Sequence, residues 1–251
     1  MNWNASFKYQ ATEIKRPAAI FYFVVLCVTI FMFIIAFMNS DSIGAAQYQG
    51  YEISTAIFVF VLGLCSFKES FGMLLQNGIS RKTMFLSKML VFPVWCLLFA
   101  VIDRLFILLG SWLTSLNEKI IYTGLQSQMY PQHVQEIGGF RQFAEGILFN
   151  FCMYMAFAAI GFFITILFYR MNKGGKIAVS IGIPALALFV LPVVDGYLFQ
   201  GAVFRKLAQF LDFSLGLSAQ NPFAAMMTGF LCFLIFGGLS YAAMRKAVVK
   251  N

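Results

Sequence analysis

The sequence predicts an all-α protein of a lipid bilayer, with six transmembrane helices and both termini in the cytoplasm. Of its 251 residues, 61% are hydrophobic and only 11% are charged, whereas about a quarter of the residues in a soluble domain are charged. Apolar runs of roughly 18 residues or more recur along the chain, which is typical of helices that cross a bilayer. We expect residues 1–251 to form a single membrane domain, because the hydrophilic stretches are too short to fold alone.

The apolar runs set the limits of the predicted spans. The first run is too long for the apolar region of a cleavable signal peptide, so we expect it to remain in the protein. The second run is the weakest candidate, because it spans only if Glu52 and Lys68 reach the two membrane surfaces or if the helix runs beyond them. The six predicted spans are Pro17–Met38, Ile53–Phe67, Met89–Leu113, Ile147–Tyr169, Ile177–Val194 and Ala224–Ala243.

The basic residues predict the orientation, because Lys and Arg accumulate in short cytoplasmic loops. Most of the 18 basic residues lie on the side that holds both termini and the loops after the second and fourth spans. They are Lys8, Lys15, Arg16, Lys68, Arg81, Lys82, Lys88, Arg170, Lys173, Lys176, Arg245, Lys246 and Lys250. We therefore expect a multi-pass protein of the cell membrane. Its net charge of +8 indicates orientation rather than nucleic-acid binding.

Two further segments are expected at the membrane surface. Residues 1–16 have the pattern of an amphipathic helix in the headgroup layer, with a disordered tail as the alternative. The apolar face of this helix consists of Trp3, Phe7, Ala11 and Ile14. Pro17 is expected to end it and to start the first span. Residues 195–222 are too apolar for an exposed loop, so we expect two short outer helices that dip toward the membrane, broken near Gly201 and Gly216.

The chain lacks the residue clusters of a membrane enzyme. His133 is the only histidine and falls in a predicted outer loop, so the spans cannot build a histidine metal site or a Ser-His pair. No two acids share helical spacing within a span, which argues against a carboxylate dyad. The NKGGK run ending at Lys176 is no nucleotide-binding loop. The five cysteines have no pairing or metal spacing and are expected to be small buried hydrophobes.

The most informative segment is the predicted cytoplasmic run KESFGMLLQNGISRKTMFLSK, from Lys68 to Lys88. A short apolar face is formed there by Phe71, Leu74 and Leu75. The Asn77-Gly78 pair is expected to end a helix, and Ser80 to cap the helix that becomes the third span. A short surface helix before a tight turn suits docking into a groove on a soluble partner. The alternative is that basic residues here only set the orientation and contact anionic headgroups, the interpretation we favour for Lys82 and Lys88.

This run resembles the coupling region of ABC type-2 export permeases, in which glycine, serine and a basic pair recur in the same order. The predicted layout of interfacial helix, six spans, cytoplasmic termini and semi-buried outer segment is also similar. The resemblance implies cytoplasmic ABC ATPase subunits that bind residues 68–82 of this chain, and a second permease copy or related permease. ATP and Mg²⁺ would then bind to the partner ATPase, with no cofactor and no catalytic site in this chain. The residues implied in coupling are Glu69, Phe71, Leu74, Leu75, Gln76, Gly78 and Arg81.

Asp103 and Arg104 are the one charged pair inside a predicted span. Ionisable groups at such depth cost about 2.5–3.5 kcal/mol each on insertion and usually face protein or water. One hypothesis is that one of them faces a transport pathway and contacts substrate. The interpretation we favour is a structural ion pair with another element, for which Asp195 and Glu145 are candidates.

Two hypotheses about function follow. The first, implied by the resemblance, is the permease subunit of an ABC exporter. Its 31 phenylalanines and clustered methionines suit an amphipathic or hydrophobic substrate, such as a peptide, a lipid-like molecule or a drug, although they equally suit lipid contact. The second is an ATP-independent secondary transporter, or a membrane sensor or immunity scaffold. An ion-coupled carrier should contain more membrane-embedded acids than Asp103 alone.

Overall fold

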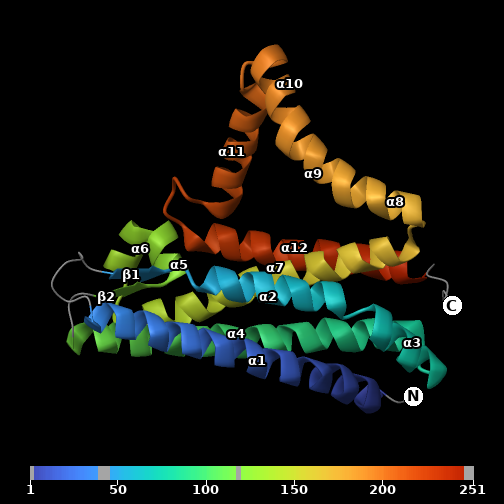
Figure 1. Cartoon of the computed structure of the whole chain (residues 1–251), viewed down its shortest axis with the longest axis horizontal. Coiled ribbons are helices and arrows are strands. Elements are labelled where there is room, and N and C mark those ends of the chain that lie inside the picture. The colour runs from blue at the N-terminus through green and yellow to red at the C-terminus, as the bar shows by residue number, and fades with distance from the viewer. Residues whose placement is uncertain (1–2, 39–45, 117–119, 246–251) are drawn as a thin grey trace.

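A computed structural model describes residues 3–38, 46–116 and 120–245 (Figure 1). Nearly all of this part of the chain is helical. Five of its helices are long and apolar enough to cross a membrane, and a pair of helices bent by 40° makes a sixth candidate if it counts as one span. The prediction of a helical, strongly apolar membrane-type fold is confirmed, and the candidate spans number five or six.

Most of the long helices lie side by side in a main bundle (Figure 1). The bundle contains α1 (Trp3–Met38), α2 (Glu52–Cys65), α3 (Lys68–Gln76), α4 (Arg81–Leu116), α7 (Gly139–Arg170) and α12 (Pro222–Arg245). Helix α7 packs against α2, α4 and α12, while α1 packs against α4. One end of the bundle carries the short helices α5 (Leu125–Met129) and α6 (Pro131–Glu136). The other end carries α3 and both ends of the described chain.

A small sheet departs from the all-α prediction. Strands β1 (Ala46–Gln49) and β2 (Ile120–Thr123) pair in parallel, with Ala46 opposite Ile120 and Gln49 opposite Thr123. These four-residue strands are too short to leave a recognisable alternating pattern in the sequence. Their pairing joins the connection after α1 to the connection after α4.

Helix α1 runs without a break through Pro17, so the predicted boundary between an interfacial helix and the first span is wrong. A proline inside a helix removes one backbone donor, but neighbouring turns of α1 are held by packing. Ile14 and Ala18 are buried, and Ser6 and Gln10 continue the same stripe toward the N-terminus. The side of α1 that faces the protein is therefore partly polar. A headgroup position for residues 1–16 stays a prediction.

A separate helical arm follows α7 and leans away from the bundle (Figure 1). It is a continuous rod composed of α8 (Lys173–Ile177), η1 (Ala178–Gly182), α9 (Ile183–Ala185), η2 (Leu186–Val190) and α10 (Leu191–Leu198). None of its most apolar 18-residue stretch is buried within the chain. The predicted fifth span lies entirely within this rod.

The arm returns to the bundle through α11 (Ala202–Leu215). The predicted breaks at Gly201 and Gly216 are confirmed, because both glycines adopt left-handed conformations, with φ of 78° and 65°. The expected pair of short outer helices is corrected in one respect. Only α11 is a separate short helix, since α10 continues the rod. The prediction that this segment dips toward the membrane remains a prediction.

Helices α2 and α7 approach each other at small residues. A Cβ atom on Gly161 would overlap the carbonyl oxygen of Phe60, and one on Gly63 would lie 2.6 Å from the carbonyl oxygen of Ala158. Neither position has room for a side chain. This contact brings the bent pair of helices against the central helix of the bundle.

We expect Gly161→Ala to lower the free energy of unfolding by about 1–3 kcal/mol, because the added methyl group must push the two backbones apart. Thermal unfolding of the purified chain in detergent micelles measures the change. Gly238→Ala is the matched control, since Gly238 lies in α12 with no atom within 4 Å of the added carbon. A melting temperature of Gly161→Ala at or above that of the unmodified chain would contradict the close contact.

Candidate functional site

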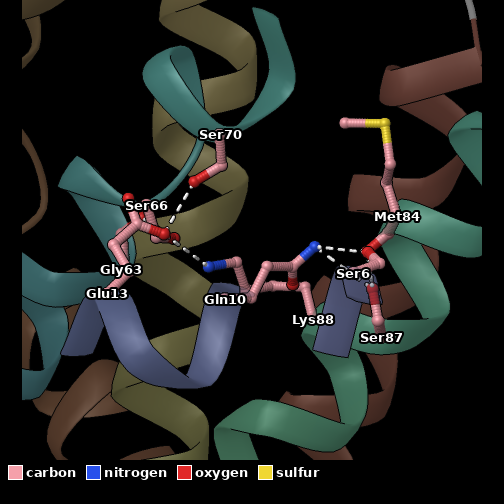
Figure 2. A network of polar contacts seen from close by, with 9 residues as sticks. All are labelled: Ser6, Gln10, Glu13, Gly63, Ser66, Ser70, Met84, Ser87 and Lys88. Carbon is pink, nitrogen blue, oxygen red and sulfur yellow. Dashed lines mark hydrogen bonds and ion pairs between the residues drawn. The ribbon is translucent and has the colours of Figure 1, made fainter. Parts of the chain in front are cut away.

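Polar side chains gather in two places inside the bundle. The first group, the bend cluster, surrounds the break between α2 and α3 and consists of Ser6, Gln10, Glu13, Ser66, Ser70, Ser87 and Lys88 (Figure 2). The second group, the carboxylate cluster, lies between α1, α2, α4 and α7 and consists of Tyr22, Glu52, Thr55, Asp103, Arg104, Asn150 and Tyr154. Both groups are built from residues far apart in the sequence.

Glu13 of α1 links α3 to α4 in the bend cluster (Figure 2). The Ser70 hydroxyl of α3 donates a hydrogen bond of 2.7 Å to Glu13 Oε2. Lys88 Nζ of α4 lies 3.8 Å from the same oxygen. One turn earlier, Gln10 Nε2 donates to Ser87 Oγ at 3.1 Å and to the Met84 carbonyl oxygen at 3.3 Å. Helix α1 is therefore attached to α4 and to the short helix α3 by side-chain contacts.

Lys88 is only 2% exposed, and its Nζ has no hydrogen-bond partner within the described part of the chain. Its nearby counter-charge is Glu13, and its Nζ also lies 5.7 Å from the centre of the Phe92 ring. The interpretation of Lys88 as a headgroup contact is therefore wrong. The residue is enclosed because α1 covers the side of α4 on which it lies.

The apolar face of α3 is used within the chain itself. Phe71 and Leu74 are 1% and 4% exposed and belong to the main core. The Phe71 ring packs against Phe67 and Tyr169, with centroids 4.8 and 5.8 Å away. Leu75 is partly buried against the same core. The expectation that Phe71 and Leu74 meet a partner is corrected, because they anchor α3 to the bundle.

The opposite face of α3 is free for contact. Glu69, Met73 and Gln76 are exposed there. If a partner binds α3, these are the side chains that it can reach. Glu69 and Gln76 therefore remain candidates for coupling, and Met73 is a candidate that the sequence pattern did not single out.

The turn after α3 has the predicted form. Gly78 adopts a left-handed conformation with φ of 72°, and the Asn77 amide donates to the Met73 carbonyl oxygen at 2.8 Å. The Ser80 hydroxyl accepts a hydrogen bond of 3.2 Å from the Thr83 backbone N–H, which confirms it as the cap of α4. Arg81 Nη1 donates to the Arg245 carbonyl oxygen at 2.9 Å. Arg81 thus ties this corner to the end of α12.

Asp103 occupies the centre of the carboxylate cluster and is 0% exposed. Its Oδ1 accepts a hydrogen bond of 2.8 Å from the Tyr22 hydroxyl of α1. Its Oδ2 accepts from the Tyr154 hydroxyl of α7. The Thr55 hydroxyl of α2 also faces this carboxyl group. Four helices therefore meet at one buried acid.

Arg104 points to different partners. It is 4% exposed, and its Nη2 donates to the Gln142 carbonyl oxygen at 2.8 Å. A Cβ atom placed on Gly124 would lie 3.0 Å from Arg104 Nη1 and 3.1 Å from Glu52 Oε1, so these two charged groups are neighbours. A Cβ atom on Gly146 would overlap the guanidinium group, so only glycine leaves room for it.

Glu52 is the acid that Arg104 meets, and it is also 0% exposed. The Leu125 backbone N–H lies 3.0 Å from both of its carboxylate oxygens. The Asn150 amide of α7 faces it from another side. The start of α5 and helix α7 therefore enclose Glu52 within the protein. Its position at a membrane surface stays a prediction.

The two acids suggested as partners of Arg104 bind elsewhere. Asp195 accepts from the backbone N–H groups of Val203 and Phe204 at 2.9 and 3.0 Å and so caps α11. Glu145 pairs with Arg141 at 2.7 Å and with His133 at 2.8 Å. The geometry thus supports a structural role for Arg104, which donates to the Gln142 carbonyl oxygen and has the negative charge of Glu52 nearby.

Open hollows occur at the end of the bundle that carries α5 and α6. Arg104 lines one of them, with a volume of about 200 Å³, together with Ser127 and Gln142. A larger groove of about 800 Å³ lies between α11 and α12. Beside it, the Tyr130 hydroxyl donates to the Leu215 carbonyl oxygen at 2.5 Å, and burial raises the pKa of Tyr130 to about 12. This bond joins the region of α5 and α6 to the end of α11.

Neither the cysteines nor the other metal-ligating residues form a site in the part of the chain that the structure describes. No group of three or more His, Cys, Asp or Glu residues there could hold a metal ion. All five cysteines are free thiols. Cys96 and Cys152 are buried as expected, whereas Cys27 and Cys65 lie on the outside of their helices.

No protein-family model, curated protein or solved structure matches this chain. Its function has to be inferred from the sequence pattern, the arrangement of its helices and the two polar clusters.

We expect Glu13→Gln to lower the free energy of unfolding by about 1–3 kcal/mol, because the buried Lys88 ammonium loses its counter-charge. The lower part of this range allows for the partial exposure of Glu13. The double variant Glu13→Gln/Lys88→Met should recover most of the loss, since it removes the unpaired charge as well. Thermal unfolding of both variants in detergent measures this. A double variant no more stable than Glu13→Gln would contradict the pairing.

We expect Arg104→Met to lower the free energy of unfolding by about 1–3 kcal/mol, because the Gln142 carbonyl oxygen loses its charged donor and the buried Glu52 loses a nearby positive charge. Arg205→Met is the control, since Arg205 is exposed on α11 and should tolerate the change within about 0.5 kcal/mol. Unfolding in denaturant provides the measurement. An Arg104→Met chain that is as stable as the control but inactive in transport would instead assign Arg104 to substrate contact.

Proposed function

We propose that this chain is the transmembrane permease subunit of an ATP-driven exporter. It moves an amphipathic or hydrophobic substrate outward and receives energy from separate ABC ATPase subunits. Two lines of argument support this proposal. One is the resemblance of the run from Phe71 to Lys88 to the coupling region of ABC type-2 export permeases. The other is the way in which α3 is attached to the spanning helices.

The attachment of α3 is the observation that carries the proposal. Its inner face is fixed by Phe71 and Leu74 in the core and by the hydrogen bond from Ser70 to Glu13. Its outer face exposes Glu69, Met73 and Gln76. A force applied to the exposed face is therefore passed to α1 through Glu13 and to α4 through the short turn. This is the arrangement that a coupling helix requires.

The placement of the chain ends supports a cytoplasmic position for α3. Both ends of the described chain lie at the same end of the bundle as α3 (Figure 1), and Arg81 contacts the Arg245 backbone there. The basic residues that predict orientation accumulate in the same segments. In the proposed topology, α3 and both termini face the cytoplasm of the cell, and α5, α6 and α11 lie on the outer side.

The groove between α11 and α12 supports an amphipathic substrate. Its lining is largely apolar, and its polar members are Asp212, Ser214, Ser218, Asn221 and Thr228. The Thr228 hydroxyl already donates a hydrogen bond of 2.6 Å to the Ser214 carbonyl oxygen. A peptide or a lipid-like molecule offers apolar and polar groups that match such a surface.

In the proposed cycle, ATP and Mg²⁺ bind to the partner ATPase subunits and draw them together. The bound α3 helices of two permease copies then move, and the pathway between the copies opens outward. Within this chain, α3 receives the motion, while α1 and α4 carry it along the bundle.

One observation favours a second candidate function, an ion-coupled secondary transporter. Two acids, Glu52 and Asp103, are fully enclosed by the bundle, where the sequence pattern indicated only Asp103. Enclosed acids are a feature of membrane carriers that move protons or sodium ions. This candidate needs no ATPase subunit.

Co-purification tests the leading proposal. Tagged chain extracted in mild detergent should bring down an ABC ATPase, and Gln76→Arg should reduce the amount recovered about tenfold for a loss of about 1.4 kcal/mol at the interface. Gln209→Arg is the matched control, an exposed glutamine of α11 that the proposed topology places on the outer side. Equal losses in both variants, or no ATPase with either chain, would contradict the proposal.

Transport in reconstituted vesicles separates the two candidates. Outward movement of an amphipathic peptide that requires ATP and the co-purified ATPase supports the permease. Accumulation by the chain alone, driven by a proton or sodium gradient, supports the ion-coupled carrier and overturns the permease.

A further inference from the structure

The carboxylate cluster contains two acids and one cation. Glu52 and Asp103 are each 0% exposed, and Arg104 is 4% exposed. The Arg104 guanidinium lies beside Glu52 and donates to the Gln142 carbonyl oxygen. One negative charge, on Asp103, is therefore left without a cation in its surroundings.

The groups that face Asp103 come from every helix packed around it. Tyr22 of α1 and Tyr154 of α7 donate their hydroxyl hydrogens to its two oxygens. Thr55 of α2 faces the same group, and Glu52, at the start of α2, adds a second negative charge. Among the described residues, no Lys, Arg or His forms an ion pair with Asp103. Its neighbours are thus neutral hydroxyls and one further acid.

The carboxylate cluster also contains buried polar atoms that have no hydrogen-bond partner. Thr55 Oγ1 has no hydrogen-bond partner although Thr55 is 0% exposed. Asn150, which is 1% exposed and faces Glu52, has no partner for either amide atom. A buried polar atom without a partner costs about 1–3 kcal/mol. Polar groups with unused hydrogen-bonding capacity therefore lie next to both buried acids.

We propose that Asp103 is a proton-binding site of the helical bundle. The carboxylate takes one H⁺ from water, an O–H bond forms on one carboxyl oxygen, and the cluster loses one negative charge while every other group keeps its charge. The new O–H can donate to Thr55 Oγ1, which then has a partner. Both carboxyl oxygens can still accept from Tyr22 and Tyr154, because each retains a lone pair.

Burial supplies the physical reason. An isolated ionised carboxylate in a medium of low polarity is far less stable than the neutral acid, so such a group takes up a proton or binds a cation. Among the described residues, no basic side chain pairs with Asp103 and neutralises its charge. Proton binding at Asp103 does not require an ATPase subunit. It can therefore be tested on this chain alone.

Infrared spectroscopy of the full chain in lipid nanodiscs tests the site. At neutral pH we expect a carbonyl stretching band of a protonated carboxylic acid, which shifts in D₂O and disappears in Asp103→Asn. Glu145→Gln is the control and should keep the band, because Glu145 is paired with Arg141 and His133. The proposal is overturned if the unmodified chain lacks the band or if Asp103→Asn retains it.

A second variant decides the question if Asp103→Asn fails to fold. Tyr22→Phe removes one hydroxyl donor and leaves the acid in place, so the band should persist and shift in frequency. A band that does not shift would belong to another acid and would overturn the assignment. A melting temperature that rises with Na⁺, in a chain without the band, would assign the site to a metal cation instead.

Discussion

A charged side chain that this apolar bundle encloses has to be neutralised inside it, and the arrangement of the helices depends on that constraint. In a soluble protein a lysine or glutamate can turn its charged group toward water. In a spanning helix the charged group can reach water only near the helix ends. Lys88 Nζ therefore lies 3.8 Å from Glu13 Oε2, and Arg104 donates to the Gln142 carbonyl oxygen with the negative charge of Glu52 nearby. Each of these pairs joins two helices that are separated in the sequence.

The same constraint explains why glycine occupies two positions of α7. Gly146 leaves space for the Arg104 guanidinium, and Gly161 lets α7 touch the backbone of α2. A larger residue at the first position would displace the cation, and one at the second would separate the helices that enclose Tyr154 and Glu52. These glycines thus allow both the close backbone contact and the burial of the guanidinium group. Small residues are common where helices pack closely in membranes.

Helices α1 and α4 take part in both polar clusters. Lys88 and Asp103 lie on α4 about 22 Å apart, at about 1.5 Å per residue. Each contacts a residue of α1, Glu13 and Tyr22 respectively. A displacement of α3 would therefore act on helices that also enclose Asp103. The arm of α8 to α10 differs, because its apolar surface is not covered within the chain. In a bilayer that surface contacts lipid or a neighbouring subunit.

The sequence by itself determined features that depend on neighbouring residues. The lengths of the apolar runs predicted a helical membrane-type fold, Asn77-Gly78 and Ser80 predicted the turn before α4, and Gly201 and Gly216 predicted the breaks around α11. Each signal is local, because it depends on the composition of a run, on a left-handed backbone conformation or on a cap within three residues. Packing had little influence on these features.

Only the tertiary structure decided the rest. Pro17 suggested a helix boundary, yet packing on α4 keeps α1 continuous. The face of α3 that carries Phe71 and Leu74 turned inward rather than toward a partner. Arg104 donates to the Gln142 carbonyl oxygen and lies near Glu52, instead of pairing with Asp195 or Glu145. These outcomes depend on how each helix is rotated against its neighbours, and that rotation is set by contacts between residues tens of positions apart.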